Sequence, residues 1–173
     1  MQQSGSSSKQ PTLECNTMRF VKLLVFLLVF LFSVETPFGK DAPSFWIKNL
    51  ERQRFDSRKQ DQPYVLSFFF VHCVPCIKEI PALYKLMKSE FPETPLLFID
   101  PVKEDSKRDI VKFSKKLKVP RSYFYRDNFG SVSKKFFAGK IAFPAIIGIR
   151  DKEFKFQSNK FDDETASMIM DLY

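Results

Sequence analysis

The feature that most restricts the fold of this chain is a pair of cysteines between a strand-like and a helix-like segment. A run of mainly aromatic and β-branched residues spans Tyr64–Val71 and begins after Pro63, which is typical of a buried central strand in a parallel sheet. Cys73 and Cys76 follow, and apolar residues then recur at helical spacing as far as Phe91. This order of strand, C-x-x-C and helix predicts an α/β fold with both sulfurs at the start of a helix.

The remaining chain alternates between strand-like and helix-like patterns. Parallel crossovers come first and an antiparallel hairpin comes near the end, so we expect an α/β sandwich built around a mixed sheet. Residues 51–63 are charged and turn-like, and Pro81 should kink the helix that contains it. We expect strands at 44–50, 64–71, 95–100, 122–127, 142–149 and 154–157, and helices at 74–91, 104–119, 131–139 and 162–173.

The N-terminal region has the pattern of an export segment. Residues 1–17 are polar and Ser-rich, which predicts a disordered extension, and Met18 is a second candidate start. Basic residues then precede the apolar run Leu23–Phe32 and a polar exit, as in an export signal. An uncleaved membrane anchor and a buried N-terminal helix are the alternatives. We therefore divide the chain into an extension at 1–17, a signal or anchor at 18–39, and one domain at 40–173 outside the cytoplasm.

The formal net charge of +8 restricts the class of partner. Basic residues gather on the helix-like segments 106–118 and 132–137, which is typical of solvated helix faces. The alternative is that this basic surface favours acidic partners or anionic lipid head groups. No nucleic-acid-binding module accompanies them, so we expect no nucleic-acid partner. The 21 Phe residues indicate a Phe-rich core.

The two cysteines are spaced for a reversible disulfide. Residues three apart at the start of a helix lie on one face, so their sulfurs can reach bonding distance. Cys73 would lie at the helix N-terminus, where free N–H groups and the dipole stabilise a thiolate, and we expect its sulfur to be exposed. Cys76 would be more shielded and remain a thiol. Cys73 would therefore form a mixed disulfide with a partner, and Cys76 would resolve it.

Three other interpretations compete with a redox pair. A zinc site needs four ligands, but beyond the two cysteines and the single His, His72, only the remote Cys15 is available, so we predict no metal. A purely structural disulfide would usually close a longer loop. The third alternative is a domain that keeps its cysteines without using them.

These motifs resemble the thioredoxin superfamily, and more narrowly the TlpA/ResA-like membrane-anchored thiol–disulfide oxidoreductases. "APSF" at 42–45 is similar to the start of that domain, and "CVPCIKEIP" at 73–81 is similar to its C-x-P-C-x-x-E-x-P core. "RDNFGSVSKKF" at 126–136 and "AFPAIIGI" at 142–149 resemble the segments around its substrate-docking loop. The resemblance covers about residues 41–160.

This resemblance implies a thioredoxin-like sandwich, with a central mixed β-sheet flanked by α-helices. It also implies exchange with cysteine-containing protein substrates, an upstream thiol–disulfide donor, tethering to a membrane by the N-terminal apolar segment, and no cofactor. The predicted activity is therefore that of a thiol–disulfide oxidoreductase. A redox-inactive binding or chaperone-like module is the alternative, and a thiol peroxidase is a weaker one.

Three residues near the cysteines are expected to tune them. His72 replaces the Trp that the family carries, and an imidazolium there would stabilise the Cys73 thiolate unless the ring is merely exposed. Pro75 lies in the first helical turn, where its missing N–H costs nothing. Glu79 could accept a proton from Cys76, or it could simply face solvent.

Two further positions depart from or match the family pattern. Ser67 stands in the strand where thioredoxin carries a buried Asp, so proton transfer needs another group such as Glu79. Pro144 would be the cis-proline facing the disulfide, with a trans proline as the alternative. Together with Phe143 it would form the substrate-docking groove, where an extended substrate pairs with exposed backbone.

Overall fold

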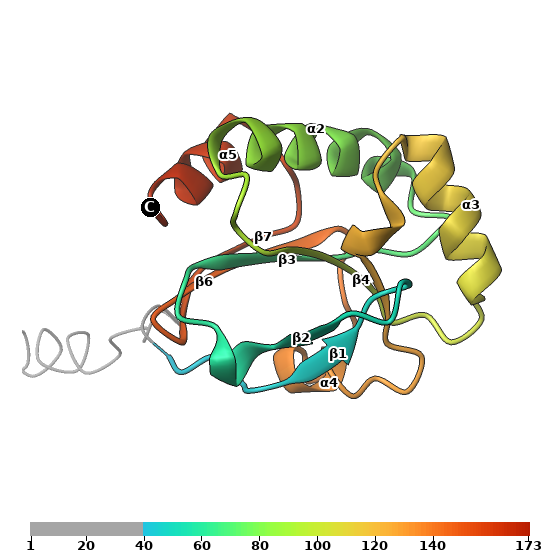
Figure 1. Ribbon diagram of the computed structural model, residues 1–173, viewed down its shortest axis with the longest axis horizontal. Coiled ribbons are helices and arrows are strands. Elements are labelled where there is room, and N and C mark those ends of the chain that lie inside the picture. The colour runs from blue at the N-terminus through green and yellow to red at the C-terminus, as the bar shows by residue number, and fades with distance from the viewer. Residues whose placement is uncertain (1–39) are drawn as a thin grey trace, which may run out of the picture. The chain divides into compact units, whose positions relative to one another are not determined.

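A mixed five-stranded sheet forms the centre of the structure, a computed structural model that describes residues 40–173 (Figure 1). The strand order is β5-β4-β3-β6-β7. The parallel pairs are β3 with β4 and β4 with β5, whereas β6 runs antiparallel to both β3 and β7. The strands are β3 at Tyr64–Phe68, β4 at Leu96–Asp100, β5 at Phe124–Arg126, β6 at Ala145–Arg150 and β7 at Glu153–Ser158.

Two layers cover the faces of this sheet. The long helices lie on one face, and a two-stranded antiparallel sheet of β1 and β2 lies on the other with the short helix α4 (Figure 1). The helices are α2 at Val74–Glu90, α3 at Lys107–Leu117, α4 at Ser133–Phe136 and α5 at Asp163–Met170; β1 spans Trp46–Lys48 and β2 spans Arg54–Asp56, and the 3₁₀ turns η1 and η2 span Ser57–Lys59 and Arg121–Tyr123.

The alternation of side chains along β3 explains why both layers are needed. All five residues of β3 are buried. Val65 packs into the cluster beneath the long helices, whereas Leu66 and Phe68 pack into the cluster beneath β1 and α4. Side chains of neighbouring residues in a strand point to opposite faces, so a strand that is apolar throughout needs cover on both sides.

The start of each long helix is fixed by a side chain. Ser106 and Asp109 form a reciprocal capping box at the start of α3, which satisfies N–H groups that the helix leaves free. Cys73 is the N-cap of α2, and Pro75 lies in the first turn as expected. Pro81 does not end α2, which continues to Glu90.

The predicted mixed sheet with flanking helices is confirmed, although the ends of most elements differ from the prediction by a few residues. β3 ends at Phe68 rather than Val71, so residues 69–73 form a loop that leads to the cysteines. The turn-like assignment of 51–63 was wrong, because this segment contains β2 and η1. β2 is a charged edge strand whose conformation is set by pairing with β1, and such pairing leaves no apolar pattern in the sequence.

Within residues 40–173, no helix is both long enough and apolar enough to cross a bilayer. The extension at 1–17 and the signal or anchor at 18–39 lie outside the described residues.

Candidate redox site

The two cysteines of the C-x-x-C motif form a disulfide at the start of α2. Cys73 and Cys76 are bonded to each other, and their Cα atoms lie 5.3 Å apart. The backbone N–H of Cys76 donates a hydrogen bond of 3.3 Å to the Sγ atom of Cys73. The spacing therefore brings the sulfurs together on one face of the helix, as predicted.

The expectation that Cys73 is exposed was wrong for this disulfide form. Cys73 is 2% exposed and Cys76 is fully buried. Both belong to the apolar cluster beneath the long helices, against which the half-buried rings of Phe70 and Phe143 pack. Because Cys73 is bonded to Cys76 within this cluster, and because the rings of Phe70 and Phe143 pack against the cluster, solvent reaches little of this residue.

A cis peptide bond joins Phe143 to Pro144, as predicted. The register of β3 and β6 pairs Phe68 with Ala145, so Pro144 lies beside the end of β3. The loop of residues 69–73, called the redox loop below, begins there. The rings of Phe143 and Phe70 contact each other with 5.1 Å between their centroids. Sequence positions some 70 residues apart are thus brought together at one edge of the sheet. The docking role of Phe143 and Pro144 stays a prediction.

The residues expected to tune the cysteines differ in their surroundings. His72 is exposed in the turn before Cys73. Ser67 is buried within β3. Glu79 is half-buried, and its Oε2 accepts a hydrogen bond of 2.8 Å from the backbone N–H of Phe161. Glu79 is therefore not a freely solvated helix residue.

Burial, partly offset by the N–H of Phe161, raises the pKa of Glu79, and the negative charge of Asp162 raises it further. A carboxyl group with a raised pKa is a better proton acceptor near neutral pH than an ordinary one. Its transfer of a proton from Cys76 stays a prediction.

Sequence reasoning missed two buried acids at the end of β4. Asp100 is fully buried and Asp105 is 6% exposed. Oδ2 of Asp105 accepts a hydrogen bond of 3.0 Å from the N–H of Val71, inside the loop that leads to Cys73. The sequence does hold a signal for Asp100, because it ends an apolar strand and the carboxyl ends of β3 and β4 meet at the same edge of the sheet. It holds no comparable signal for the contact of Asp105 with Val71.

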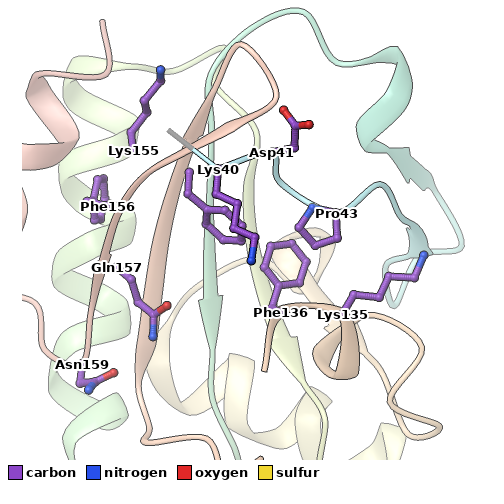
Figure 2. Close-up of a pocket in the computed structure, with 10 residues that line it drawn as sticks. Lys40, Asp41, Pro43, Lys135, Phe136, Lys155, Phe156, Gln157 and Asn159 are labelled. Carbon is purple, nitrogen blue, oxygen red and sulfur yellow. The ribbon is translucent and has the colours of Figure 1, made fainter. Parts of the chain in front are cut away.

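A cavity of about 700 Å³ lies apart from the redox residues, along β7. Figure 2 shows Lys40 extending toward Phe136, with Gln157 and Asn159 on the side of β7. Neither cysteine, nor His72, nor the Phe143–Pro144 pair lines it. The cavity therefore belongs to a different part of the surface.

Comparisons with known proteins identify the fold. No protein-family model and no curated protein sequence matches the chain. Many solved structures do, among them a putative protein disulfide isomerase of Bacteroides thetaiotaomicron, with a TM-score of 0.69, 20% sequence identity, and coverage of 78% of this chain and 87% of that one.

Two others have descriptions that name the chemistry. One is a secreted disulfide oxidoreductase of Mycobacterium tuberculosis, described as homologous to DsbE of E. coli (TM-score 0.62, 20% identity, 73% of this chain and 95% of that one). The other is a thiol:disulfide interchange protein of the thioredoxin family from Chlorobium tepidum (TM-score 0.63, 16% identity, 78% and 97%). At these identities the likeness establishes the fold alone, which is thioredoxin-like.

Proposed function

We propose that this protein is a thiol–disulfide oxidoreductase that exchanges disulfides with cysteine-containing proteins, with Cys73 attacking and Cys76 resolving. The observation that carries the proposal is the disulfide between these two residues at the N-terminus of α2, within a thioredoxin-like fold. The cis Phe143–Pro144 bond beside the end of β3 supports it. Solved structures with the same fold are described as disulfide oxidoreductases.

The exchange needs only the two sulfurs and the partner. In the reduced protein, the Cys73 thiolate attacks a sulfur of the partner's disulfide, and the other partner sulfur leaves as a thiolate. Cys76, as its thiolate, then attacks the sulfur of Cys73 in the mixed disulfide. The Cys73–Cys76 bond forms, and the partner leaves with both cysteines reduced. Two electrons pass to the partner, and an upstream thiol donor restores the dithiol. The reverse sequence oxidises a partner.

The start of α2 favours the charge on Cys73 during this cycle. An N-cap sulfur lies beside N–H groups that have no helical partner, and the Cys76 N–H already points at it. We expect the exposed imidazole of His72 to add to this when protonated. Cys76 loses its proton to Glu79, directly or through water, when it attacks.

Reduction of insulin by dithiothreitol tests the proposal, with wild type, Cys73→Ser and Cys76→Ser compared. We expect the wild type to accelerate reduction and both variants to lose the acceleration. Cys76→Ser should trap a mixed disulfide with a cysteine-containing substrate, whereas Cys73→Ser should not. Equal rates in all three proteins would refute the function.

A second function is favoured by the burial of Cys73. A binding or chaperone-like module would use the groove near Phe143 without turnover, and a residue that is only 2% exposed suits such a module. In that case both serine variants would retain full binding to an unfolded client protein, and the wild type would not accelerate insulin reduction.

We also propose that the domain works outside the cytoplasm, delivered or held there by residues 18–39. The support is the basic start, the apolar run Leu23–Phe32 and the polar exit. The similar M. tuberculosis protein is described as secreted. Stable disulfides persist mainly in such oxidising compartments.

A further inference from the structure

The loop between β3 and α2 sets where the redox pair lies, and it is held by three backbone N–H groups. One of these bonds differs from the other two, because its acceptor is a side chain from another part of the chain. The Phe69 bond fixes the start of the loop to the backbone of β4 and the Val71 bond fixes its middle to a carboxylate of the following loop, whereas the Cys73 bond stays within the loop. The three bonds, each 3.0 Å long, run from Phe69 N–H to the Ile99 carbonyl, from Val71 N–H to Oδ2 of Asp105, and from Cys73 N–H to the Phe70 carbonyl.

Asp105 is itself held firmly in place. It lies in the loop between β4 and α3 and is 6% exposed. Its carbonyl oxygen accepts a hydrogen bond of 2.7 Å from Nε of Arg126, whose Nη2 also donates to the carbonyl of Lys103. Arg126 thus donates these hydrogen bonds to backbone oxygens of the loop that contains Asp105. They fix the backbone of Asp105, and its side chain can therefore hold Val71 in one position.

A second buried acid completes the arrangement. Oδ1 of Asp100 accepts a hydrogen bond of 2.8 Å from the N–H of Val102. Its Oδ2 is buried and has no hydrogen-bond partner among residues 40–173. A carboxylate oxygen without a partner in an apolar interior is costly, whereas a protonated oxygen is neutral and can donate.

The surroundings favour that proton. Burial raises the pKa of Asp100 to about 8, although the N–H of Val102 lowers it, and the nearby carboxyl group of Asp105 raises it as well. The positive charge of Arg126, from β5, acts in the opposite direction with a smaller effect. Below this pKa the pair Asp100–Asp105 carries at most one negative charge, and above it two negative charges lie together in a buried site.

We propose that Asp105 is a positioning residue for the disulfide exchange, holding the redox loop through the Val71 amide, and that a proton on Asp100 keeps the two buried carboxyl groups together. The role of Asp105 in exchange rests on the proposed function. The hydrogen bond between Asp105 and the Val71 amide, called the clamp below, does not depend on it. Raising the pH until Asp100 ionises sets the two carboxylates against each other, so the Val71 hydrogen bond weakens and the loop before Cys73 loosens.

Hydrogen exchange of the Val71 amide, followed by NMR on the oxidised protein, tests the clamp without any assay of activity. We expect the protection factor of Val71, corrected for intrinsic base catalysis, to fall between pH 7 and pH 9 in the wild type. Asp105→Ala should lower it by about tenfold or more at pH 7, because a buried hydrogen bond to a charged group is lost. Asp105→Asn, which keeps an oxygen acceptor, should recover part of it.

Asp100→Asn separates the role of the proton. Asn is neutral at every pH, so this variant should keep Val71 protected at pH 9. The matched control is Asp127→Ala, which removes another buried acid at the same edge of the sheet. Asp127 holds Val132 and Ser133 rather than the redox loop, so its loss should leave Val71 protection unchanged. Unchanged protection in Asp105→Ala would overturn the clamp, and equal loss with pH in wild type and Asp100→Asn would overturn the role of the proton.

The link to exchange is read from the rate at which dithiothreitol reduces Cys73–Cys76. We expect Asp105→Ala to change this rate at pH 7 by severalfold relative to Asp127→Ala, with Asp105→Asn intermediate. If the rate is unaltered while Val71 protection is lost, Asp105 holds the loop but does not position the reaction. If the wild type fails to reduce insulin while Val71 responds as described, the proposed function fails and the clamp stands.

Discussion

At the scale of single residues, the acids around the redox pair occupy two different positions. Glu79 lies on α2 and connects this helix to the segment before α5 through Phe161. Asp105 lies after β4 and connects that loop to the segment before α2 through Val71. Each carboxyl group therefore fixes the redox helix from one side, in addition to any part in proton transfer.

Replacing Glu79 by Gln should separate its two roles. Gln retains an oxygen that can accept from the Phe161 N–H, so we expect the free energy of unfolding to change by less than about 0.5 kcal/mol. It cannot take a proton from Cys76, so resolution of the mixed disulfide should slow by about 100-fold. Stopped-flow measurement of the mixed-disulfide lifetime checks this.

Glu79→Ala is the control for the structural role, because it also removes the hydrogen bond to Phe161. It should destabilise the protein by about 1–3 kcal/mol. A mixed-disulfide lifetime in Glu79→Gln equal to that of the wild type would show that Glu79 is not the proton acceptor.

Asp100 should make stability depend on pH in a defined direction. Its folded pKa of about 8 lies above the ordinary aspartate pKa of 3.8, so between these values the folded state holds a proton that the unfolded state has released. Its contribution to stability is therefore fully present below pH 4 and is lost as pH rises toward 8.

Urea denaturation of wild type and Asp100→Asn at several pH values measures this contribution. The variant should gain on the wild type by roughly 1.4 kcal/mol per pH unit at most between pH 4 and 8, and by nothing further above that. A stability difference that stays constant over this range would mean that Asp100 is ionised throughout.

At the scale of elements, the contact between β6 and β7 depends on a residue without a side chain. Gly148 pairs with Phe156, and a Cβ atom placed on Gly148 would lie 2.1 Å from Cε1 of the Phe156 ring. The ring would have to leave its buried position, where it is only 3% exposed. The Phe156 ring therefore occupies the space that a side chain at position 148 would need.

Gly148→Ala should consequently destabilise the protein by about 1–3 kcal/mol, through displacement of a packed ring. Gly139→Ala is the matched control, since nothing lies within 4 Å of its added Cβ, and it should change stability by less than about 0.5 kcal/mol. Thermal unfolding of both variants checks this. Equal melting temperatures for the two would show that Phe156 adjusts without cost.

The elements differ in how well their sequences predict them. β3 and β4 could be predicted because each is a short apolar run that follows a Pro residue, and such a run indicates a buried strand. The start of α3 was placed three residues too early, at Glu104 instead of Lys107, because the acidic residues Glu104 and Asp105 lie in the loop before the helix. β2 could not, because Arg54 and Asp56 are polar and the strand exists through pairing with β1. The end of β3 was misplaced because Phe69–Val71 continues the apolar pattern after the ladder has ended.

At the scale of the whole molecule, the site is assembled at one edge of the sheet from segments far apart in the sequence. The cysteines could be found from spacing alone, and the cis-proline was located through the family resemblance. The clamp could not be found in this way, because nothing local in the sequence indicates that Asp105 lies beside Val71. The burial of Cys73 depends on rings from separate segments and was equally hidden.

The proposed location of the domain makes a prediction for the complete chain. Residues 18–42 fused to a reporter enzyme that is active only outside the cytoplasm should confer reporter activity, because a basic start followed by an apolar run is the pattern of an export signal. Replacing two leucines of Leu23–Phe32 by Lys should abolish it, whereas two Lys substitutions in the polar exit of the same fusion, at Glu35 and Thr36, should not. A reporter that stays inactive with the intact segment would contradict the location.

The small exposed fraction of Cys73 also affects which thiols and disulfides can react with this residue. A thiolate must approach a disulfide nearly along the sulfur–sulfur axis, and the rate of exchange depends on that approach as well as on the driving force. When most directions are closed by protein, few collisions of a small thiol have the required geometry, and small thiols react more slowly than a polypeptide that fits the surface. The shape of the surface around Cys73 therefore discriminates between small thiols such as glutathione and a polypeptide that docks there, before any electron is transferred.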